Sequence, residues 1–394
     1  MKIIYIFTSP TLTSSSVQNK VLSQIEAINQ SGVLCIGAFF STQIVDETKL
    51  NDKVSFYPVV KAKQSFFNKI YQRRQLDKAL YDFIEREYAD TDFFYIRNPG
   101  STFLFTKLVK RFGKKIVIEH QSKELDEIKS LMKENVFGLK PSKFLSWFQY
   151  SFWPFYNEVL FGHRINKKIR ASIAVTNEIA QFQRQKGSKN VFTITNGITV
   201  KNYSLRQPVE FKSELNLLFL KGSSGYSPWN GFDRLVDSID HYYLNIENKA
   251  EIKLFVYGNH SEGEIPKRDY IVEGGYLTGV ELDTIFNQIH IGVSGIQVYL
   301  KNFKEATSLK IREYIARGLP FIYAYTDPDL NEDSKEFALE FPNDDSLIDM
   351  EKVIEFAKKA LEDKELPQKM RKYAEEHLDY EVKMKKLYQE LQRL

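Results

Sequence analysis

The sequence predicts an α/β fold in which parallel sheets are covered by helices on both faces, a doubly wound arrangement. Short runs rich in β-branched and aromatic residues alternate with longer segments of helical periodicity, and this order is typical of parallel sheets. The length, 394 residues, exceeds what one hydrophobic core usually serves, so two series of runs predict two Rossmann-like domains. The runs are KIIYIF, VLCIGAFF, VSFYPVV, DFFYIR, KIVIEH, SIAVT and VFTIT in the first half, and LNLLFL, IKLFVYG, HIGVS and PFIYAY in the second.

The boundary between the two domains is expected near residue 200. There TNGI, residues 195–198, ends a strand with Asn-Gly, and a polar stretch precedes the next strong strand. We therefore expect an N-terminal domain over 1–199 and a C-terminal domain over 200–378. The last residues, 379–394, form an amphipathic pattern that predicts a helix packing back on the first domain. Its apolar positions are Tyr380, Val382, Met384, Leu387, Leu391 and Leu394.

Composition and charge narrow the class of protein. A chain with 43% hydrophobic and 27% charged residues is of the ordinary soluble globular kind. The net charge of +4 is too mild to indicate nucleic-acid binding. The single cysteine, Cys35, allows no intrachain disulfide and favours a reducing compartment. The apolar run before Pro10 is too short for a secretory signal, and no window approaches the length that spans a membrane.

The stretch EATSLKIREYIARGLPF, residues 305–321, carries the strongest functional signal. Its periodic apolar residues predict a helix that begins after Thr307 or Ser308 and ends at a glycine. The free N–H groups and positive dipole end of such a helix bind anions. Glu305 would lie before the helix, and Glu313 about two turns inside it, where a carboxylate can bind a diol such as ribose. The order of sugar, diphosphate and ribose contacts is that of a nucleotide sugar.

This stretch resembles a motif of the retaining glycosyltransferases of family four, in which two glutamates flank seven residues and "EY-A-GLP" follows. That family has the GT-B fold, two Rossmann-like domains that face each other across a cleft. WNGFDRL, residues 229–235, is similar to the "W-x-G-x-D-R-L" of a branch that builds capsule and lipopolysaccharide. TNGI resembles the family's interdomain segment, and SSSVQNKVLSQIEAINQSG resembles its N-terminal loop and helix. The landmarks run from residue 14 to 321.

The resemblance implies roles for the matching residues. Glu305 and His120 would face the reacting sugar, and Glu313 would bind the ribose. The implied donor-binding residues are Thr307, Ser308, Leu309, Lys310, Arg312, Glu313, Gly222 and Ser223. The implied acceptor-side residues are Arg97, Glu119, Ser15 and Ser16. Four of these residues also have a structural alternative: Arg97 could cap a helix, His120 could be a satisfied imidazole, Glu305 could be a solvated loop carboxylate, and Glu313 could pair with Lys310 or Arg317.

One departure from the family pattern concerns the diphosphate. Many members hold it with an arginine and a lysine in the first loop of the C-terminal domain, where this chain has Ser223 and Asn230. Compensating positive charge must then come from elsewhere. The candidates, in order, are Lys310, Arg312, Lys221 and Lys301.

The implied chemistry needs no metal and no cofactor beyond the nucleotide-sugar donor. Two Asp-x-Asp triplets, Asp90 with Asp92 and Asp327 with Asp329, are interpreted as turns, since Asp and Pro favour turns. The six histidines show no ligand-like clustering, and His290 in NQIHIGVS is interpreted as structural.

The sequence thus predicts a retaining glycosyltransferase that moves a sugar to a glycan or lipid-linked acceptor, in the cytoplasm or at the inner face of the plasma membrane. Bacterial surface polysaccharide synthesis is the setting that the resemblance implies. A sugar-nucleotide epimerase with the GT-B fold would need more catalytic acidic residues and histidines in its cleft than we find in the sequence. A degenerate GT-B subunit that stabilises a partner glycosyltransferase is the other alternative. The basic segment 61–78 and the aromatic segment 143–161 could form a face that contacts a membrane. Alternatively, segment 143–161 is a buried helix of the first domain and segment 61–78 is its solvated neighbour.

Overall fold

A computed structural model of the protein describes residues 1–9, 15–41, 52–59, 68–134, 141–221, 228–247, 250–261 and 263–394. The chain divides into two compact units, unit 1 with residues 1–195 and 384–394 and unit 2 with residues 196–383. The domain ends expected at residues 199 and 378 lie four and five residues from these points. The chain therefore passes from one unit to the other twice.

Unit 1 is built on a seven-stranded sheet in which all neighbours run parallel, in the order β3-β2-β1-β4-β5-β6-β7. The order changes direction between β1 and β4, and ligands of open α/β sheets bind outside the carboxyl ends of the strands at such a switch point. The strands are β1 Lys2–Ser9, β2 Leu34–Ser41, β3 Val54–Pro58, β4 Phe93–Arg97, β5 Ile116–His120, β6 Ala171–Ala174 and β7 Val191–Thr193.

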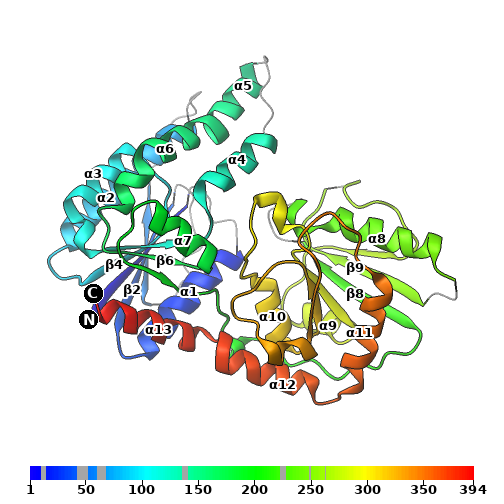
Figure 1. Ribbon diagram of the computed structural model, residues 1–394. Helices are drawn as coiled ribbons and strands as arrows, with labels where there is room; N and C mark the ends of the chain where they lie inside the picture. Colours follow the sequence, from blue (N-terminus) through cyan, green and yellow to red (C-terminus); the bar gives the residue numbers. More distant parts are fainter. Residues whose placement is uncertain are drawn as a thin grey trace. The chain divides into compact units, whose positions relative to one another are not determined.

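Helices cover both faces of this sheet (Figure 1). Ile4, Ile6, Phe94 and Ile96 point to the face that packs against α2, α3 and the end of α6. The alternate residue Tyr5 points to the opposite face and hydrogen-bonds Gln24 of α1. The helices are α1 Ser15–Gln30, α2 Asn68–Glu87, α3 Phe103–Phe112, α4 Glu124–Glu134, α5 Pro141–Trp147, α6 Trp153–Asn166 and α7 Asn177–Gln185.

Unit 2 repeats the doubly wound plan with a six-stranded parallel sheet, in the order β10-β9-β8-β11-β12-β13. Here the order switches between β8 and β11. One core cluster packs Leu217 and Phe219 against α8 and α11, and a second packs Leu218 against α10 and α12. The strands are β8 Glu214–Leu220, β9 Glu251–Tyr257, β10 Ile271–Gly274, β11 Ile291–Ser294, β12 Phe321–Tyr323 and β13 Ala338–Glu340.

The doubly wound prediction is confirmed, and each of the predicted runs contains or overlaps a strand of the structure. The sequence missed β10 and β13, which are the two edge strands of unit 2 and are short and partly exposed. An edge strand needs no continuous apolar run, so the signal used to find the others was absent. The helices of unit 2 are α8 Phe232–Asn245, α9 Gly279–Phe286, α10 Leu309–Arg317, α11 Met350–Glu362 and α12 Leu366–Tyr373.

The C-terminal segment forms α13, Tyr380–Gln392, which spans the second passage between the units. Tyr380, Met384, Leu387 and Leu391 are buried along one stripe of this helix, as predicted. Val382 is 41% exposed, so its assignment to the apolar face was wrong. Position 382 lies off the stripe because it falls between residues four apart that already face the core.

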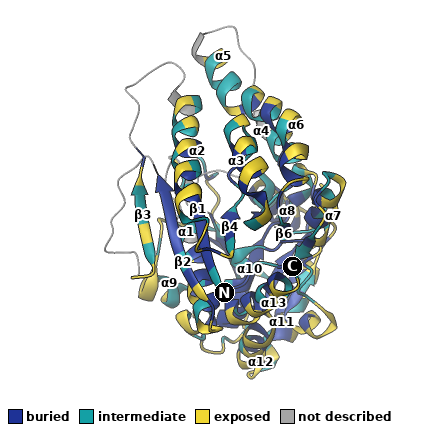
Figure 2. Ribbon diagram, turned by 90° about the vertical axis from the view of Figure 1, so that its left-hand side faces the viewer, coloured by how far each residue is buried: buried dark blue, intermediate teal, exposed yellow. Residues whose placement is uncertain are grey.

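The aromatic segment of unit 1 lies on the surface. In Figure 1, α5 and the start of α6 extend away from the sheet, and Figure 2 shows exposed and half-buried residues along both helices. A π-helical turn, Phe148–Phe152, joins them. Exposed side chains include Phe144, Tyr150, Phe152 and Tyr156. Residues 61–67 of the basic segment lie outside the described residues. Within the described part of the chain, no helix is long and apolar enough to cross a membrane.

Candidate functional site

The helix predicted around residues 309–317 is α10, and its N-terminus has no side-chain cap. Buried Ile311 and Ile315 anchor it, and Gly318 ends it with φ 77°, a conformation that favours glycine. Ser308 is the N-cap residue, but its side chain makes no capping hydrogen bond; its Oγ instead lies 3.1 Å from Ser294 Oγ at the end of β11. The first-turn N–H groups therefore point out of the helix without a side-chain cap, beside the switch point of the sheet.

The loop before α10 is held in place by two backbone–backbone hydrogen bonds and one side chain–backbone hydrogen bond. Glu305 forms a parallel bridge with Thr326, in which Ala306 N donates to Thr326 O at 3.2 Å and Thr326 N donates to Lys304 O at 2.9 Å. Asn196 Nδ2 donates to the carbonyl of buried Thr307 at 2.8 Å. The asparagine of TNGI is thus tied to the loop that carries Glu305, a contact the sequence did not reveal.

Lys310 lies in the first turn of α10, and its Nζ is 5.5 Å from the ring centroid of Phe219 at the end of β8. Burial lowers the pKa of Lys310 to about 8, and no charged group in the described part of the chain offsets that effect. A half-buried ammonium with no carboxylate beside it among the described residues favours an anionic ligand. Lys310 is therefore the cation best placed to meet a diphosphate at the N-terminus of α10.

Glu313 lies one turn further along the same side of α10. Its Oε1 accepts a hydrogen bond from Arg317 Nε at 2.9 Å, so the structural alternative of an ion pair is realised. Arg317 is shared with Asp283, which also binds it. Burial raises the pKa of Glu313 in spite of Arg317. The remaining oxygen, Oε2, has no hydrogen-bond partner among the described residues and is available to a hydroxyl group.

The other proposed cations are engaged within unit 2. The guanidinium of Arg312 is fully buried; it pairs with Asp327 and Asp329, and its Nε donates to Asn196 O at 3.0 Å. Lys221 pairs with Glu264. Lys301 Nζ lies 3.6 Å from the ring centroid of Trp229. Arg312 and Lys221 each have an internal carboxylate, so we leave them out of the proposed diphosphate contacts. Gly222 and Ser223 lie outside the described residues.

The second Asp-x-Asp triplet forms an internal ionic network. Asp327 is buried and bound by Arg312, and Asp329 accepts a hydrogen bond from Lys383 Nζ at 2.6 Å. The Asp327 carboxyl also accepts a hydrogen bond from Asp329 N at 3.1 Å, as in a turn. The pair thus stabilises the end of β12 and joins it to α13.

The WNGFDRL segment supports the switch point of unit 2. Gly231 caps α8 with φ 82°, and a Cβ atom there would lie 2.3 Å from Ile296. Arg234 is buried and donates to the carbonyls of Ile296, Ser346 and Pro342. The glycine is therefore required by backbone and packing, and the arginine holds the loop after β11 in position.

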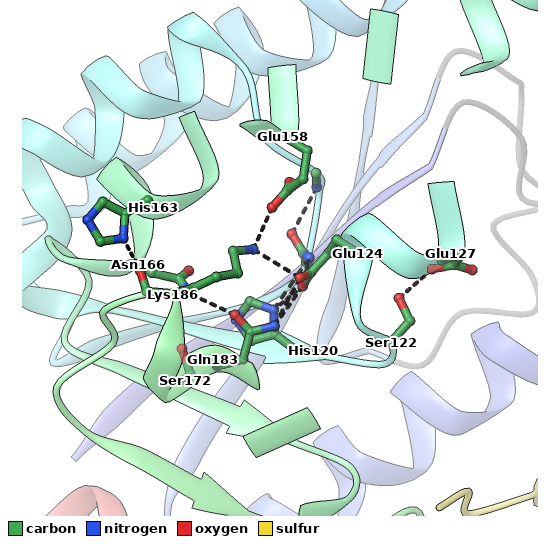
Figure 3. A network of polar contacts seen from close by, with 12 residues as sticks. His120, Ser122, Glu124, Glu127, Glu158, His163, Asn166, Ser172, Gln183 and Lys186 are labelled. Carbon is green, nitrogen blue, oxygen red and sulfur yellow. Dashed lines mark hydrogen bonds and ion pairs between the residues drawn. The ribbon is translucent and has the colours of Figure 1, made fainter. Parts of the chain in front are cut away.

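His120 ends β5 of unit 1 and belongs to a buried network that Figure 3 shows. Its Nδ1 lies 2.5 Å from Glu124 Oε1 at the start of α4. Glu124 also accepts hydrogen bonds from Asn98 Nδ2 at 2.8 Å, Gln183 Nε2 at 3.0 Å and Lys186 Nζ at 2.9 Å. Burial opposes ionisation of Glu124, but the charges of His120 and Lys186 outweigh it and hold its pKa well below the ordinary value.

The other ring nitrogen of His120 is available for chemistry. The imidazole is 2% exposed, and Nε2 has no hydrogen-bond partner in the described part of the chain. Glu124 occupies Nδ1, so Nε2 is the ring nitrogen left to form a hydrogen bond with a ligand, for example with a sugar hydroxyl. The sequence offered one signal for this network, the spacing of four residues between His120 and Glu124. The other partners of Glu124 are Gln183 of α7, Lys186 at the end of α7 and Asn98 after β4, and only the fold brings them together.

The remaining acceptor-side residues lie on the opposite face of the same sheet. Glu119 precedes His120 in β5, so their side chains point to opposite faces. Glu119 accepts hydrogen bonds from Lys20 Nζ at 3.0 Å, Gln24 Nε2 at 3.1 Å and Tyr5 OH at 3.0 Å. Arg97 is the register partner of Glu119 in β4. Ser15 and Ser16 begin α1, and their side chains lie outside what the structure describes.

Known structures with two such units are similar to this chain over its full length. The apo form of the lipopolysaccharide outer core galactosyltransferase WaaB has 11% identity and a TM-score of 0.60, with 98% of each chain covered. The pneumococcal O-GlcNAc transferase GtfA in complex with UDP and GlcNAc has 12% identity and a TM-score of 0.54, with 100% of this chain and 99% of that chain covered. The N-terminal domain of Candida albicans trehalose-6-phosphate phosphatase has 10% identity and a TM-score of 0.62, covering 99% and 96%.

These similarities establish the fold and, at such identities, the fold alone. The two parallel sheets of seven and six strands match those of GT-B glycosyltransferases, so the chain has the GT-B fold that the sequence predicted. No protein-family model and no curated protein matches the sequence.

Proposed function

We propose that the protein is a retaining glycosyltransferase that moves a sugar from a nucleotide-sugar donor to a glycan or lipid-linked acceptor. The observation that carries the proposal is the start of α10, where N–H groups without a side-chain cap and the half-buried ammonium of Lys310 lie at the switch point of unit 2. Glu305 precedes this start and Glu313 follows it, each on a backbone fixed by hydrogen bonds.

On the donor side, unit 2 binds a nucleoside diphosphate. The N–H groups of Leu309 and Lys310 donate to the diphosphate, and the Lys310 ammonium balances the negative charge that grows as the sugar leaves. Oε2 of Glu313 accepts a hydrogen bond from a ribose hydroxyl, while Arg317 fixes the position of the Glu313 carboxylate. Glu305 contacts hydroxyl groups of the sugar.

On the acceptor side, unit 1 supplies His120. Glu124 orients the ring, and Nε2 forms a hydrogen bond with a hydroxyl of the acceptor. The acceptor hydroxyl attacks the anomeric carbon from the side on which the diphosphate leaves, the bond to the diphosphate breaks, and the hydroxyl proton passes to the departing phosphate oxygen, so that configuration is retained.

The proposal is tested by calorimetric titration of UDP, GDP, ADP and CMP and their common sugar conjugates into the wild type, Glu313→Ala and Glu305→Ala. One nucleotide should bind; Glu313→Ala should weaken it, and Glu305→Ala should lower turnover of the conjugate with a smaller loss of affinity. Glu375→Ala is the matched control, because Glu375 also accepts from an arginine four residues away, Arg371, but lies on the surface. Equal losses of affinity in both site variants would contradict the division of roles.

One observation favours a second candidate. Arg312 and Lys221, two of the four cations expected near the diphosphate, are neutralised by internal carboxylates. A GT-B subunit that stabilises a partner glycosyltransferase needs no diphosphate site. If no nucleotide in the panel binds the wild type, this candidate replaces the enzyme.

We further propose that the protein works in surface polysaccharide synthesis, in the cytoplasm at the inner face of the plasma membrane. The support is the exposed aromatic surface of α5 and α6, with Phe144, Phe152 and Tyr156, beside exposed cations of α3 such as Lys107, whose Nζ lies 4.8 Å from the ring centroid of Phe103. Aromatic rings next to lysines are the pattern that binds anionic lipid surfaces.

A further inference from the structure

Two cations share one carboxylate at the carboxyl edge of the unit 1 sheet. Lys20 of α1 pairs with Glu119 of β5 at 3.0 Å, and the charge of Arg97 of β4, the register partner of Glu119, also acts on that carboxylate. Glu119 is itself satisfied by Lys20, Gln24 and Tyr5. Within this cluster Lys20 and Glu119 hold each other, and Arg97 is a second cation beside the same carboxylate.

Two side chains beside this cluster have buried hydrogen-bond donors without a partner among the described residues. Arg97 Nη1 is buried and has no hydrogen-bond partner within the described residues. Gln121 Nε2 is also buried and has no hydrogen-bond partner within the described residues. The other atom of this amide, Oε1, accepts a hydrogen bond from Lys20 Nζ at 3.0 Å, so the amide nitrogen points away from the lysine. Leaving a buried guanidinium N–H unpaired is costly, and such groups normally have a ligand or water partner.

The position of these donors is that of a ligand site. Arg97 ends β4, Gln121 follows β5, and β4 adjoins β1 at the point where the strand order of unit 1 switches. Open α/β sheets bind ligands outside the carboxyl ends of strands at this point. A guanidinium with a free edge is suited to the oxygens of a phosphate or carboxylate.

We propose that Arg97 and Gln121 form an anion subsite of unit 1, which selects an acceptor carrying a phosphate or carboxylate group. That the ligand is the acceptor of a sugar rests on the proposed function. The anion site itself follows from the unit 1 residues alone.

The test uses methyl phosphate and glucuronate as probes, which stand for the two sources of negative charge. Each is titrated into full-length wild type, Arg97→Gln, Arg97→Lys and Arg74→Gln, with binding followed by calorimetry and by the arginine side-chain 1H–15N resonance that disappears in Arg97→Gln. Arg74 is the matched control, because it is an exposed arginine of α2 in the same unit.

One probe should bind the wild type and shift the Arg97 resonance; Arg97→Gln should weaken it about tenfold or more, the usual effect of losing a hydrogen bond to a charged group. Arg97→Lys should recover part of the affinity, and Arg74→Gln should match the wild type. Absence of binding by both probes, or equal losses in Arg74→Gln and Arg97→Gln, overturns the inference. If a nucleotide binds but neither anion probe does, the anion subsite is refuted and the proposed transferase is not. If an anion probe binds but no nucleotide does, the proposed transferase is refuted and the anion subsite is retained.

Discussion

Lys310 gives the proposed donor site a pH dependence that can be calculated. In the free protein, burial lowers its pKa from 10.5 to about 8. A diphosphate beside the ammonium favours the charged form, so the pKa of Lys310 in the complex is higher than in the free protein. Binding therefore takes up a proton once the pH exceeds the free-protein pKa, and affinity falls as the pH rises through about 8.

The magnitude follows from the charged fraction of the lysine. With a pKa of about 8, roughly nine tenths of the side chains are protonated at about pH 7 and roughly one tenth at about pH 9. The nucleoside diphosphate that binds best should thus bind about tenfold more weakly at the higher pH. Proton uptake should rise from near zero to nearly one per bound nucleotide over the same range.

The assay is calorimetric titration at both pH values in two buffers of different ionisation enthalpy, which gives affinity and proton uptake together. Lys310→Met should bind more weakly at neutral pH and lose both pH effects. Lys358→Met is the matched control, since Lys358 Nζ lies 5.6 Å from the ring centroid of Phe211, a similar lysine on a ring in the same unit. The same pH profile in the wild type and Lys310→Met would refute the reasoning.

Three further predictions follow from buried pairs and the exposed aromatic surface. Arg312→Met should lower the free energy of unfolding of unit 2 by about 3–5 kcal/mol in denaturant titrations, because it leaves Asp327 charged and unpaired, whereas Lys335→Met, in an exposed ion pair, should change it little. Glu124→Gln should reduce turnover about ten- to hundredfold without changing nucleotide affinity; an altered affinity would contradict a positioning role. Phe152→Ser should weaken sedimentation with anionic vesicles, and Val382→Ser, equally exposed on α13, should not; equal effects would exclude the α5–α6 surface.

The sequence was sufficient for the elements whose signal is local. Buried parallel strands are continuous apolar runs, and the eleven predicted runs correspond to eleven of the thirteen strands found in the described part of the chain. The helix at 309–317 and its glycine end were likewise predicted, because apolar spacing and a left-handed cap are properties of neighbouring residues. Edge strands β10 and β13 lack such a signal and were missed.

The sequence determined which residues stand at the ends of strands and the start of α10, whereas tertiary structure decided what each charged side chain meets. Arg312 and Lys310 look equivalent along the chain, yet Arg312 turns inward to Asp327, whereas half-buried Lys310 meets no carboxylate among the described residues. His120 and Glu119 are adjacent, yet the sheet sends them to opposite faces and separate networks. The reason is physical: pKa values and ion pairs depend on burial and on partners distant in sequence, which only the packed units bring together.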